Sequence, residues 1–497
     1  MLLKNLLPNN SISNAQISAI EMDSRLVKSG AMFFALKGGS VDGVKFVDSA
    51  LENGAAVVVC AADADLSLLK NAANPAIIKV ENPYQVLIFA LQKFYSHLPE
   101  NILAVTGTNG KTSVAYFIQQ MQEILGKKSA SIGTLGIKIS DDNFAIKKQL
   151  TEFALTTPDI ISLYKNLAVL KAGGVDDVAI EASSIGLEQK RLAGIKIGLG
   201  SFTNFTQDHL DYHGSMDQYF DCKMLLFKDV LQPNSIALLN ADIAEFEKIK
   251  QISLENKLQV FAYSANGSNH ADCKIAEENN QTIIEIFGKK YPAKINVFGD
   301  NVADFQKANI LCALLSVVSH YHLDFAQIEF LISNLDKIKS AEGRMQLVVT
   351  LKNNAKIFID YAHTPDALQN VLQTAAKIPH QNLYVLFGCG GDRDKSKRPQ
   401  MGKIASDLAD FVIVSDDNPR TENAEQIRKE ILSACDLSKT TQIENRKNAI
   451  EQTIARLDAN DILIIAGKGH EKYQIIGKEK FEFDEKGIVQ EAINSKE

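Results

Sequence analysis

Short apolar runs alternate with segments of helical periodicity along most of the chain. Continuous apolar runs are typical of strands buried on both faces of a parallel sheet, and apolar residues three or four apart are typical of helices that cover such a sheet. The alternation predicts an α/β fold with mostly parallel sheets. The clearest predicted strands cover residues 32–36, 55–59, 76–80, 102–105, 177–181, 198–204, 356–360, 383–387, 411–414 and 461–466. The clearest predicted helices cover residues 46–51, 84–94, 114–125, 219–227 and 310–318.

The chain has 497 residues, which is too long for one hydrophobic core. At ~150 residues per domain, about three domains are expected. We predict domains at 1–97, 98–337 and 338–497, with a polar, proline-containing linker at 97–101. Residues 258–297 are expected to form a β-rich insert within the second domain.

Composition narrows the class of protein. The net charge is −7, from 53 basic and 60 acidic residues, which argues against a general nucleic-acid or anionic-membrane surface. The six cysteines include no C-x-x-C pair, so their spacing predicts neither a zinc site nor a disulfide framework and fits a reducing compartment. No apolar run approaches the ~18 residues needed to insert in a membrane, and the N-terminal segment is too short for a signal peptide. We therefore expect a cytoplasmic protein.

The clearest chemical signal is the run Ala-Val-Thr-Gly-Thr-Asn-Gly-Lys-Thr-Ser at 104–113, between a predicted strand and a predicted helix. In such a phosphate-binding loop, glycines let backbone N–H groups converge on one surface, and the helix N-terminus adds positive potential. Lys111 would reach the outer phosphates of a nucleotide, and the Thr112 hydroxyl would ligate Mg²⁺. Because Val105 occupies the first glycine position of the general pattern, the alternative is a Gly-rich connection between strand and helix.

Three further positions in the second domain carry candidate chemistry. Glu181 ends a predicted buried strand beside the phosphate loop, where a carboxylate can bind Mg²⁺ or simply face solvent. Residues 207–214 hold two histidines and two aspartates, which form either part of a site or a polar loop with a helix cap. Lys223 lies among apolar and aromatic neighbours, where a lysine ordinarily extends its charge to the surface.

In the third domain, four predicted strands each deliver polar residues at their carboxyl ends. Open α/β sheets bind ligands at that edge. We expect Arg393, Arg420, Lys468 and Glu471 to share one rim that faces the phosphate loop.

In combination these motifs resemble the Mur ligases of peptidoglycan synthesis, and within that family the branch that adds 2,6-diaminopimelate. The resemblance covers essentially the whole chain. The matching motifs are TGTNGKT (106–112), LTTPD (155–159), EASSIGLEQKR (181–191), TNFTQDHLDYHG (203–214), DYAHTPDAL (360–368), GCGGDRDKSKRP (388–399), DNPR (417–420) and GKGHE (467–471).

The resemblance implies three domains: a small N-terminal UDP-binding domain, a central P-loop ATPase domain and a C-terminal Rossmann-like domain. It implies an ATP-dependent amide ligase that joins meso-diaminopimelate to the D-Glu γ-carboxylate of UDP-MurNAc-L-Ala-D-Glu through an acyl phosphate. It also implies a monomer that uses ATP, two Mg²⁺ ions, and CO₂ bound as a carbamate on Lys223.

Site residues follow from the resemblance, position by position. The catalytic residues would be Lys111, Lys223 and His209. ATP would be held by Gly107, Thr108, Asn109, Gly110, Lys111, Thr112, Ser113, Arg344, Asp360 and His363. The UDP-sugar would be held by Met22, Ser24, Gly39, Ser40 and Val41, and the muramoyl-dipeptide end by Thr156, Thr157, Ser183, Gln189 and Arg191. Diaminopimelate would be held by Arg393, Asp417, Asn418, Pro419, Arg420, Gly467 and Glu471. The metal ligands would be Thr112, Glu181, His209 and the carbamate of Lys223.

Three alternatives remain open at this stage. A sister ligase would add L-lysine, which lacks the distal carboxylate that an arginine can grip with two hydrogen bonds. Another amide ligase of the superfamily, such as a folylpolyglutamate synthetase, fits less well with the Asp23-Ser24-Arg25 region and DNPR. A non-catalytic nucleotide switch would turn over ATP slowly and ignore the other substrates.

Overall fold

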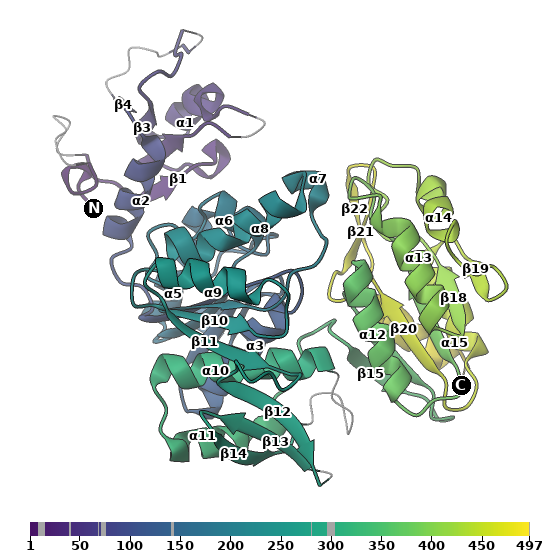
Figure 1. Ribbon diagram of the computed structural model, residues 1–497. Coiled ribbons are helices and arrows are strands. Elements are labelled where there is room, and N and C mark those ends of the chain that lie inside the picture. The colour runs from purple at the N-terminus through teal and green to yellow at the C-terminus, as the bar shows by residue number, and fades with distance from the viewer. Residues whose placement is uncertain are drawn as a thin grey trace.

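The computed structural model describes residues 1–7, 15–38, 41–67, 69–70, 76–140, 144–279, 281–295 and 304–496. Two predicted UDP-binding residues, Gly39 and Ser40, lie outside the described residues. Figure 1 shows three α/β bodies, in which the middle body lies between the N-terminal one and the C-terminal one. The predicted mostly parallel α/β class is confirmed by their sheets.

The N-terminal domain contains a four-stranded parallel sheet in the order β1-β2-β3-β4. Its strands are β1 (Ala19–Glu21), β2 (Ala31–Ala35), β3 (Ala55–Ala61) and β4 (Ile77–Val80). Its helices are η1 (Leu3–Asn5), η2 (Ser24–Leu26), η3 (Gly43–Phe46), α1 (Val47–Glu52) and α2 (Pro83–Phe94). α2 begins with a proline after the Asn82 cap, whose side chain accepts from the Gln85 N–H, and it leads the chain into the middle domain.

The middle domain is built on a ten-stranded sheet in the order β14-β13-β12-β11-β10-β9-β5-β8-β6-β7. Its strands are β5 (Asn101–Thr106), β6 (Ser129–Gly133), β7 (Gly136–Ile139), β8 (Asp177–Glu181), β9 (Leu199–Phe202), β10 (Ile236–Asn240), β11 (Gln259–Ser264), β12 (Cys273–Glu278), β13 (Gln281–Ile286) and β14 (Lys289–Ala293). Pairing is parallel from β6 to β12 and antiparallel at the two edges. The predicted β-rich insert is thus an extension of the central sheet.

Helices cover both faces of this sheet (Figure 1). They are α3 (Lys111–Ile124), α4 (Phe144–Lys147), α5 (Ile160–Ala172), α6 (Ser184–Glu188), α7 (Leu210–His213), α8 (Met216–Leu225), η4 (Leu226–Val230), α9 (Phe246–Glu255), α10 (Asp304–Tyr321), α11 (Phe325–Ile332) and η5 (Leu335–Lys337). η4 is a π-helical turn that continues α8, and such turns are frequent at functional sites.

The C-terminal domain holds a six-stranded sheet in the order β15-β16-β20-β17-β18-β19, in which only β15 runs antiparallel. Its strands are β15 (Gln346–Thr350), β16 (Lys356–Asp360), β17 (Leu383–Phe387), β18 (Phe411–Val414), β19 (Thr440–Gln442) and β20 (Ile462–Ala466), with a separate hairpin of β21 (Tyr473–Ile476) and β22 (Glu479–Glu482). Its helices are α12 (Pro365–Lys377), α13 (Lys397–Leu408), α14 (Ala424–Leu432), α15 (Arg446–Arg456) and α16 (Glu485–Lys496).

The cores show which domains are joined rigidly. One cluster of buried apolar side chains runs from the N-terminal domain through α2 into the middle domain. The C-terminal domain has two clusters of its own, one on each face of its sheet. It meets the middle domain largely through polar contacts, and such interfaces permit relative movement of domains.

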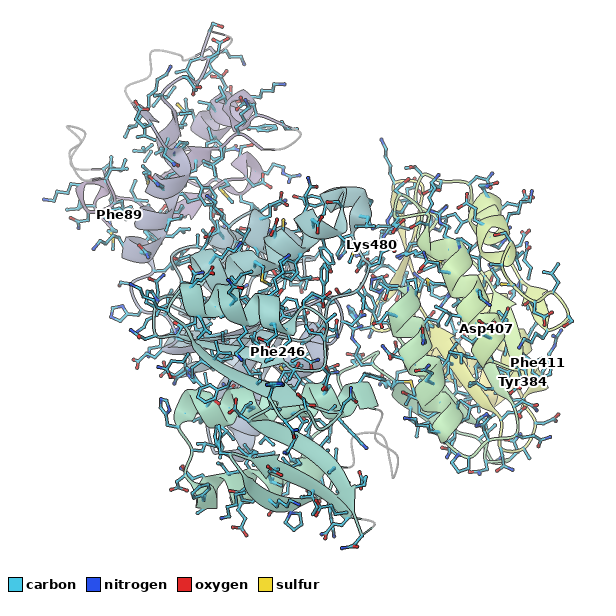
Figure 2. The ribbon with its side chains drawn as sticks, in the orientation of Figure 1. Phe89, Phe246, Tyr384, Asp407, Phe411 and Lys480 are labelled. Atoms are coloured by element: carbon cyan, nitrogen blue, oxygen red, sulfur yellow. The ribbon has the colours of Figure 1, made fainter. Side chains whose placement is uncertain are left out.

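Two outer features complete the fold. In Figure 2, Lys480 of the β21–β22 hairpin lies on the side of the C-terminal domain nearest the middle domain, and Tyr384 and Phe411 lie on the far side. The Tyr384 and Phe411 rings stack with centroids 4.6 Å apart.

Within the described ranges, no helix combines the length and the apolar character required to cross a bilayer.

Candidate active site

The phosphate loop joins the end of β5 to the start of α3. Gly107 has φ +138°, and a Cβ placed there would lie 1.9 Å from Thr203 Oγ1, so glycine is required for both conformation and space. Asn204 fixes the loop by accepting from the Asn109 N–H at 2.8 Å. The Lys111 ammonium donates to the Gly107 and Thr108 carbonyls at 2.9 and 2.7 Å, which keeps it inside the loop.

Glu181 closes the other side of this loop. Its carboxylate accepts from Thr112 Oγ1 at 2.9 Å and from the N–H and hydroxyl of Thr134 at 2.8 and 3.1 Å. Burial raises the pKa of Glu181, and a cation close to the carboxylate would offset that effect. Carboxylate and hydroxyl oxygens suit Mg²⁺, so Thr112 and Glu181 fit the metal that the sequence predicted.

Lys223 is buried, with 1% of its surface exposed, instead of reaching solvent. Its Nζ donates to the Gly107 carbonyl at 2.7 Å and lies 4.2 Å from the centre of the Tyr219 ring. Lys111 therefore shares its acceptor with Lys223. Burial, together with the Lys111 charge, places the pKa of Lys223 well below its usual range.

His209 lies in the left-handed region, with φ +53°, where α7 begins. Its Nε2 lies 3.4 Å from Asp208 Oδ2, and His363 of the C-terminal domain approaches the same oxygen at 3.8 Å. Burial lowers the pKa of His209 to about 4. Burial would raise the pKa of Asp208, but the charges of the two histidines and of Lys397 bring it below its usual range. In the described part of the chain Thr112 and Glu181 are joined by a hydrogen bond, whereas none joins His209 to Glu181 or Lys223.

A cavity of about 270 Å³ opens between the phosphate loop and the C-terminal domain. Its lining includes Asn109, Gly110 and Ser113 from one side and Arg344, Asp360, Tyr361 and His363 from the other. The Arg344 guanidinium lies 4.4 Å from the centre of the Tyr361 ring, and its Nη2 donates to Thr112 Oγ1 at 3.0 Å. Burial raises the pKa of Asp360 to about 6, while backbone N–H groups hold its carboxylate in place. The shape and polarity suit a nucleotide beside its phosphates.

The linker into the C-terminal domain is attached to α3. The Gln120 side-chain amide donates to the Lys339 carbonyl and accepts from the Lys339 N–H, both at 2.9 Å. α3 carries Lys111 and Thr112 at its other end, and Arg344 follows the linker. Gln120 therefore ties the phosphate-loop helix to the segment that leads into the C-terminal domain.

Replacing Gln120 with alanine is expected to lower kcat roughly tenfold, because two hydrogen bonds of about 0.5–1.5 kcal/mol each no longer position the linker. The affinity for ATP in the absence of the other substrates should change less than about twofold, since a tenfold change needs about 1.4 kcal/mol. Gln251→Ala removes an exposed helical glutamine whose side chain donates to Glu255 of the same helix, and it serves as the matched control. An unchanged kcat in Gln120→Ala would refute the positioning role of Gln120.

The residues predicted to hold the muramoyl-dipeptide form one network. Thr157 Oγ1 donates to the Glu181 carbonyl at 2.7 Å and lies 3.0 Å from Ser183 Oγ. Arg191 donates to the Thr157 carbonyl and to Gln189 Oε1, both at 2.6 Å. Thr156 joins through Thr134 at 3.3 Å. The structure thus brings these five predicted residues together beside Glu181.

The predicted UDP-binding residues lie in the N-terminal domain, beyond this network. Ser24 is buried at the start of η2, Met22 is half-buried and Val41 is exposed. The Tyr84 hydroxyl of α2 donates to the Gln189 and Lys190 carbonyls at 3.1 and 3.0 Å. The N-terminal domain is therefore docked on the loop that carries Gln189 and Arg191.

In the C-terminal domain the predicted amino-acid pocket surrounds Arg420. Its Nη1 donates to the Gly391 carbonyl at 2.8 Å. A Cβ at Gly390 would lie 2.7 Å from this Nη1 and 3.8 Å from Arg393 Cγ, so both arginines border the same glycine loop. Asn418 Nδ2 donates to Glu471 Oε2 at 3.0 Å, and burial raises the pKa of Glu471.

Lys468 departs from the expectation that it would share one rim with Arg393, Arg420 and Glu471. It is fully buried and donates to Asn418 Oδ1 and the Tyr473 carbonyl, both at 2.8 Å. Its charge opposes the effect of burial and keeps the pKa of Asp417 low. Lys468 therefore contacts Asp417 and Asn418 from the buried side of the domain and holds them in place. Gly467, with φ +120°, leaves room for Asp417, while Pro419 is buried between Asn418 and Arg420.

Contacts connect this pocket to the phosphate loop. Thr108 Oγ1 donates to the Thr206 carbonyl at 3.0 Å. Gln207 Nε2 donates to Asp394 Oδ2 at 2.8 Å and to Ser396 Oγ at 2.9 Å, across the domain interface. The glycine loop that precedes Asp394 carries the carbonyl that holds Arg420. The two predicted sites therefore adjoin one interface.

Several residues at this interface were not among the predicted site residues. Asn204, Gln207 and Asp208 lie on the middle-domain side, and the last two belong to the stretch 207–214 that the sequence left undecided between a site and a polar loop. Asp366 accepts from Asn109 Nδ2 at 2.7 Å, and Lys397, with 7% of its surface exposed, faces Asp208 and His363 at the start of α13. Each of these residues lies inside one of the family motifs given above, and membership of such a motif was the sequence signal that could have identified it.

Fold and site together define a three-domain enzyme whose phosphate loop faces a Rossmann-like domain. Family profiles match consecutive parts of the chain: "Mur ligase family, catalytic domain" at residues 16–95, "Mur ligase middle domain" at 105–317 and "Mur ligase, glutamate ligase domain" at 343–469. The chain belongs to the Mur ligase family.

Individual relatives match over nearly their full length. The UDP-N-acetylmuramoyl-L-alanyl-D-glutamate–2,6-diaminopimelate ligase of Rickettsia typhi is 40% identical over 489 residues, which are 98% of this chain and 95% of that protein. The protein of the same name from Rickettsia bellii is 42% identical over 481 residues, 95% of each chain. A solved structure with this name has a TM-score of 0.66 at 30% identity and covers 100% of this chain and 99% of its own. The resemblance inferred from the motifs is confirmed.

Proposed function

We propose that this chain uses ATP to join meso-2,6-diaminopimelate to the D-Glu γ-carboxylate of UDP-MurNAc-L-Ala-D-Glu. The observation that carries the proposal is the match over nearly the whole chain to relatives that bear this name. The geometry supports it, because the phosphate loop, the dipeptide network and the arginine pocket adjoin one interface. We keep 1–97, 98–337 and 338–497 as the proposed domain bounds.

The first chemical step forms an acyl phosphate. A γ-carboxylate oxygen of the substrate attacks the γ-phosphorus of ATP, the bond to the bridging oxygen breaks, and ADP leaves with the electron pair. Lys111 and the loop N–H groups bind the phosphates, and Arg344 approaches them from the C-terminal domain. The network of Thr157, Ser183 and Arg191 orients the carboxylate, so the protein supplies position and charge and no nucleophile of its own.

Magnesium belongs to this proposal. Thr112, Glu181 and His209 would hold one Mg²⁺, and a carbamate on Lys223 would hold a second; the ions would neutralise charge on the phosphates. Carbamate formation joins the Lys223 nitrogen to the carbon of CO₂ and releases one proton to solvent. A neutral amine is required, and the depressed pKa of Lys223 favours it.

The second step forms the amide. The amine of diaminopimelate attacks the acyl carbonyl carbon, the bond to the phosphate oxygen breaks, phosphate departs, and the amine proton goes to solvent. We propose that Arg420 and Arg393 grip the distal carboxylate while Asn418 and Glu471 bind the neighbouring ammonium group. Movement of the C-terminal domain would bring the amine to the acyl phosphate.

A phosphate-release assay with purified chain tests the function. With UDP-MurNAc-L-Ala-D-Glu and ATP, meso-diaminopimelate should support turnover and give the tripeptide product by mass. L-lysine should have a kcat/KM at least about 1000-fold lower, because it offers no distal carboxylate to the half-buried Arg420.

Two outcomes would contradict this function. Equal turnover with L-lysine would favour the sister ligase. Slow ATP hydrolysis whose rate does not respond to either other substrate would favour a nucleotide switch.

We also propose that the protein is a cytoplasmic monomer. A cytoplasmic location is in keeping with its six free cysteines, which suit a reducing compartment.

A further inference from the structure

Three short helices of the middle domain bring together a carboxylate, an imidazole and a thiol that the proposed reaction does not use. Glu188 ends α6, His213 ends α7 and Cys222 lies in α8. One ligand atom from each lies within 4.8 Å of the other two. α6 and α7 both pack against α8, and Figure 1 shows the three helices grouped above the sheet.

The separations suit a single metal ion after a small adjustment. With bonds of about 2.0–2.3 Å in a tetrahedral site, two ligand atoms of one Zn²⁺ lie about 3.3–3.8 Å apart. The required approach is therefore on the order of 1 Å. Glu188 is exposed and Cys222 half-buried, so both side chains can rotate, while His213 is buried and supplies the fixed point.

The His213 ring is already oriented. Its Nε2 lies 2.9 Å from Ser184 Oγ, which leaves Nδ1 as the free ligand atom, and the ring packs on Tyr219 with centroids 5.2 Å apart. Metal-binding histidines are usually held in this way by a hydrogen bond through the second ring nitrogen.

The ligand set also selects the metal. Thiolate and imidazole bind Zn²⁺ and similar ions, whereas Mg²⁺ prefers oxygen ligands. A trio of Cys, His and Glu therefore differs in chemistry from the oxygen ligands of Thr112 and Glu181. The cysteine spacing gave no sign of this trio, because its members come from separate helices.

We propose that Glu188, His213 and Cys222 form a second metal site, for Zn²⁺ or another thiophilic divalent cation, with water completing the coordination. On binding, the metal replaces the Cys222 thiol proton, which passes to solvent. Glu188 precedes Gln189 and Cys222 precedes Lys223, so an ion here would tie the dipeptide network to the helix that carries the buried lysine. The site does not depend on which amino acid the enzyme adds.

Cobalt is the probe. Full-length protein in excess Mg²⁺ is titrated with Co²⁺, and we expect one equivalent to produce the near-ultraviolet thiolate-to-cobalt band together with visible bands of low-symmetry Co²⁺. Zn²⁺ should displace it. Cys222→Ser should remove the near-ultraviolet band and weaken binding by more than about 100-fold, because loss of even an outer partner typically costs 10–100-fold.

Two further variants sharpen the test. Ser184→Ala keeps all three ligands but frees the imidazole, and should weaken Co²⁺ binding by about tenfold or more. Cys435→Ser removes another half-buried thiol, in the C-terminal domain, and should change nothing. Circular dichroism of each metal-free variant checks folding. No band in the unmodified protein, or an equal band in folded Cys222→Ser, would overturn the proposal.

Discussion

Ligation is expected to fall at least about 1000-fold in Lys223→Ala, a loss of the size seen when a key charge-stabilising group is removed from an active site. Lys223 and Lys111 donate to the same Gly107 carbonyl, so two lysine side chains lie side by side in a buried site where two positive charges would repel each other. A carbamate on Lys223 would place a negative charge there, which attracts the Lys111 ammonium. Short carboxylates such as formate or acetate should fill the vacated space and restore part of the activity of Lys223→Ala.

The comparison that decides this prediction is rescue, measured as phosphate release with and without formate. Lys228→Ala removes an exposed lysine from the turn that follows α8 and should be neutral and insensitive to formate. Depleting CO₂ should lower the activity of the unmodified enzyme only. Full activity of unrescued Lys223→Ala would contradict the carbamate role.

The sequence predicted best those strands that the fold buries on both faces. β5, β8, β17 and β20 are largely apolar runs because they are almost wholly buried. The hairpin β21–β22 escaped prediction because β22 is exposed along its whole length and has a polar sequence. Its position depends on an isolated β-bridge between Arg420 and Ile476. No local sequence pattern encodes a contact between residues so far apart in the chain.

The site residues show the same difference between local sequence signals and contacts made by distant segments. The phosphate loop was found because strand, glycine turn and helix are contiguous in sequence. Asp208 lies in the stretch 207–214 that the sequence left undecided, because its contact with His363 comes from another domain. The residue type of Lys223 suggested a surface lysine, whereas the fold shows it buried against Gly107; its proposed role comes from the resemblance.

Backbone strain is a second feature that the sequence hides. His209 and Arg420 have φ of +53° and +52° without being glycine, a conformation that costs free energy and persists when neighbours enforce it. At Arg420 the enforcing contacts come from β21, whose Ile475 carbonyl accepts from the Arg420 N–H at 3.1 Å, and from the Gly477 N–H, which donates to the Arg420 carbonyl at 2.7 Å. The hairpin thereby aims the guanidinium across the Gly390 loop.

Arg420→Ala is expected to raise the KM for diaminopimelate about 100-fold, since hydrogen bonds between charged groups contribute about 1.5–3 kcal/mol each. The KM for ATP should change less than about threefold, because Arg420 lies apart from the nucleotide cavity. The sharper readout is selectivity. L-lysine lacks the carboxylate that Arg420 is proposed to bind, so its already low kcat/KM should not fall further.

Selectivity therefore separates a binding role from a structural one. A general disturbance of the hairpin would lower kcat/KM for both amino acids. Loss of one carboxylate contact would lower kcat/KM for diaminopimelate and leave that for L-lysine unchanged. Arg420→Lys keeps the charge but not the two-pronged geometry and should fall between Arg420→Ala and the unmodified enzyme. Arg456→Ala, an exposed arginine at the end of α15, should leave every constant unchanged. If Arg420→Ala lowered kcat/KM for both amino acids equally, the amino-acid pocket would lie elsewhere on the C-terminal sheet.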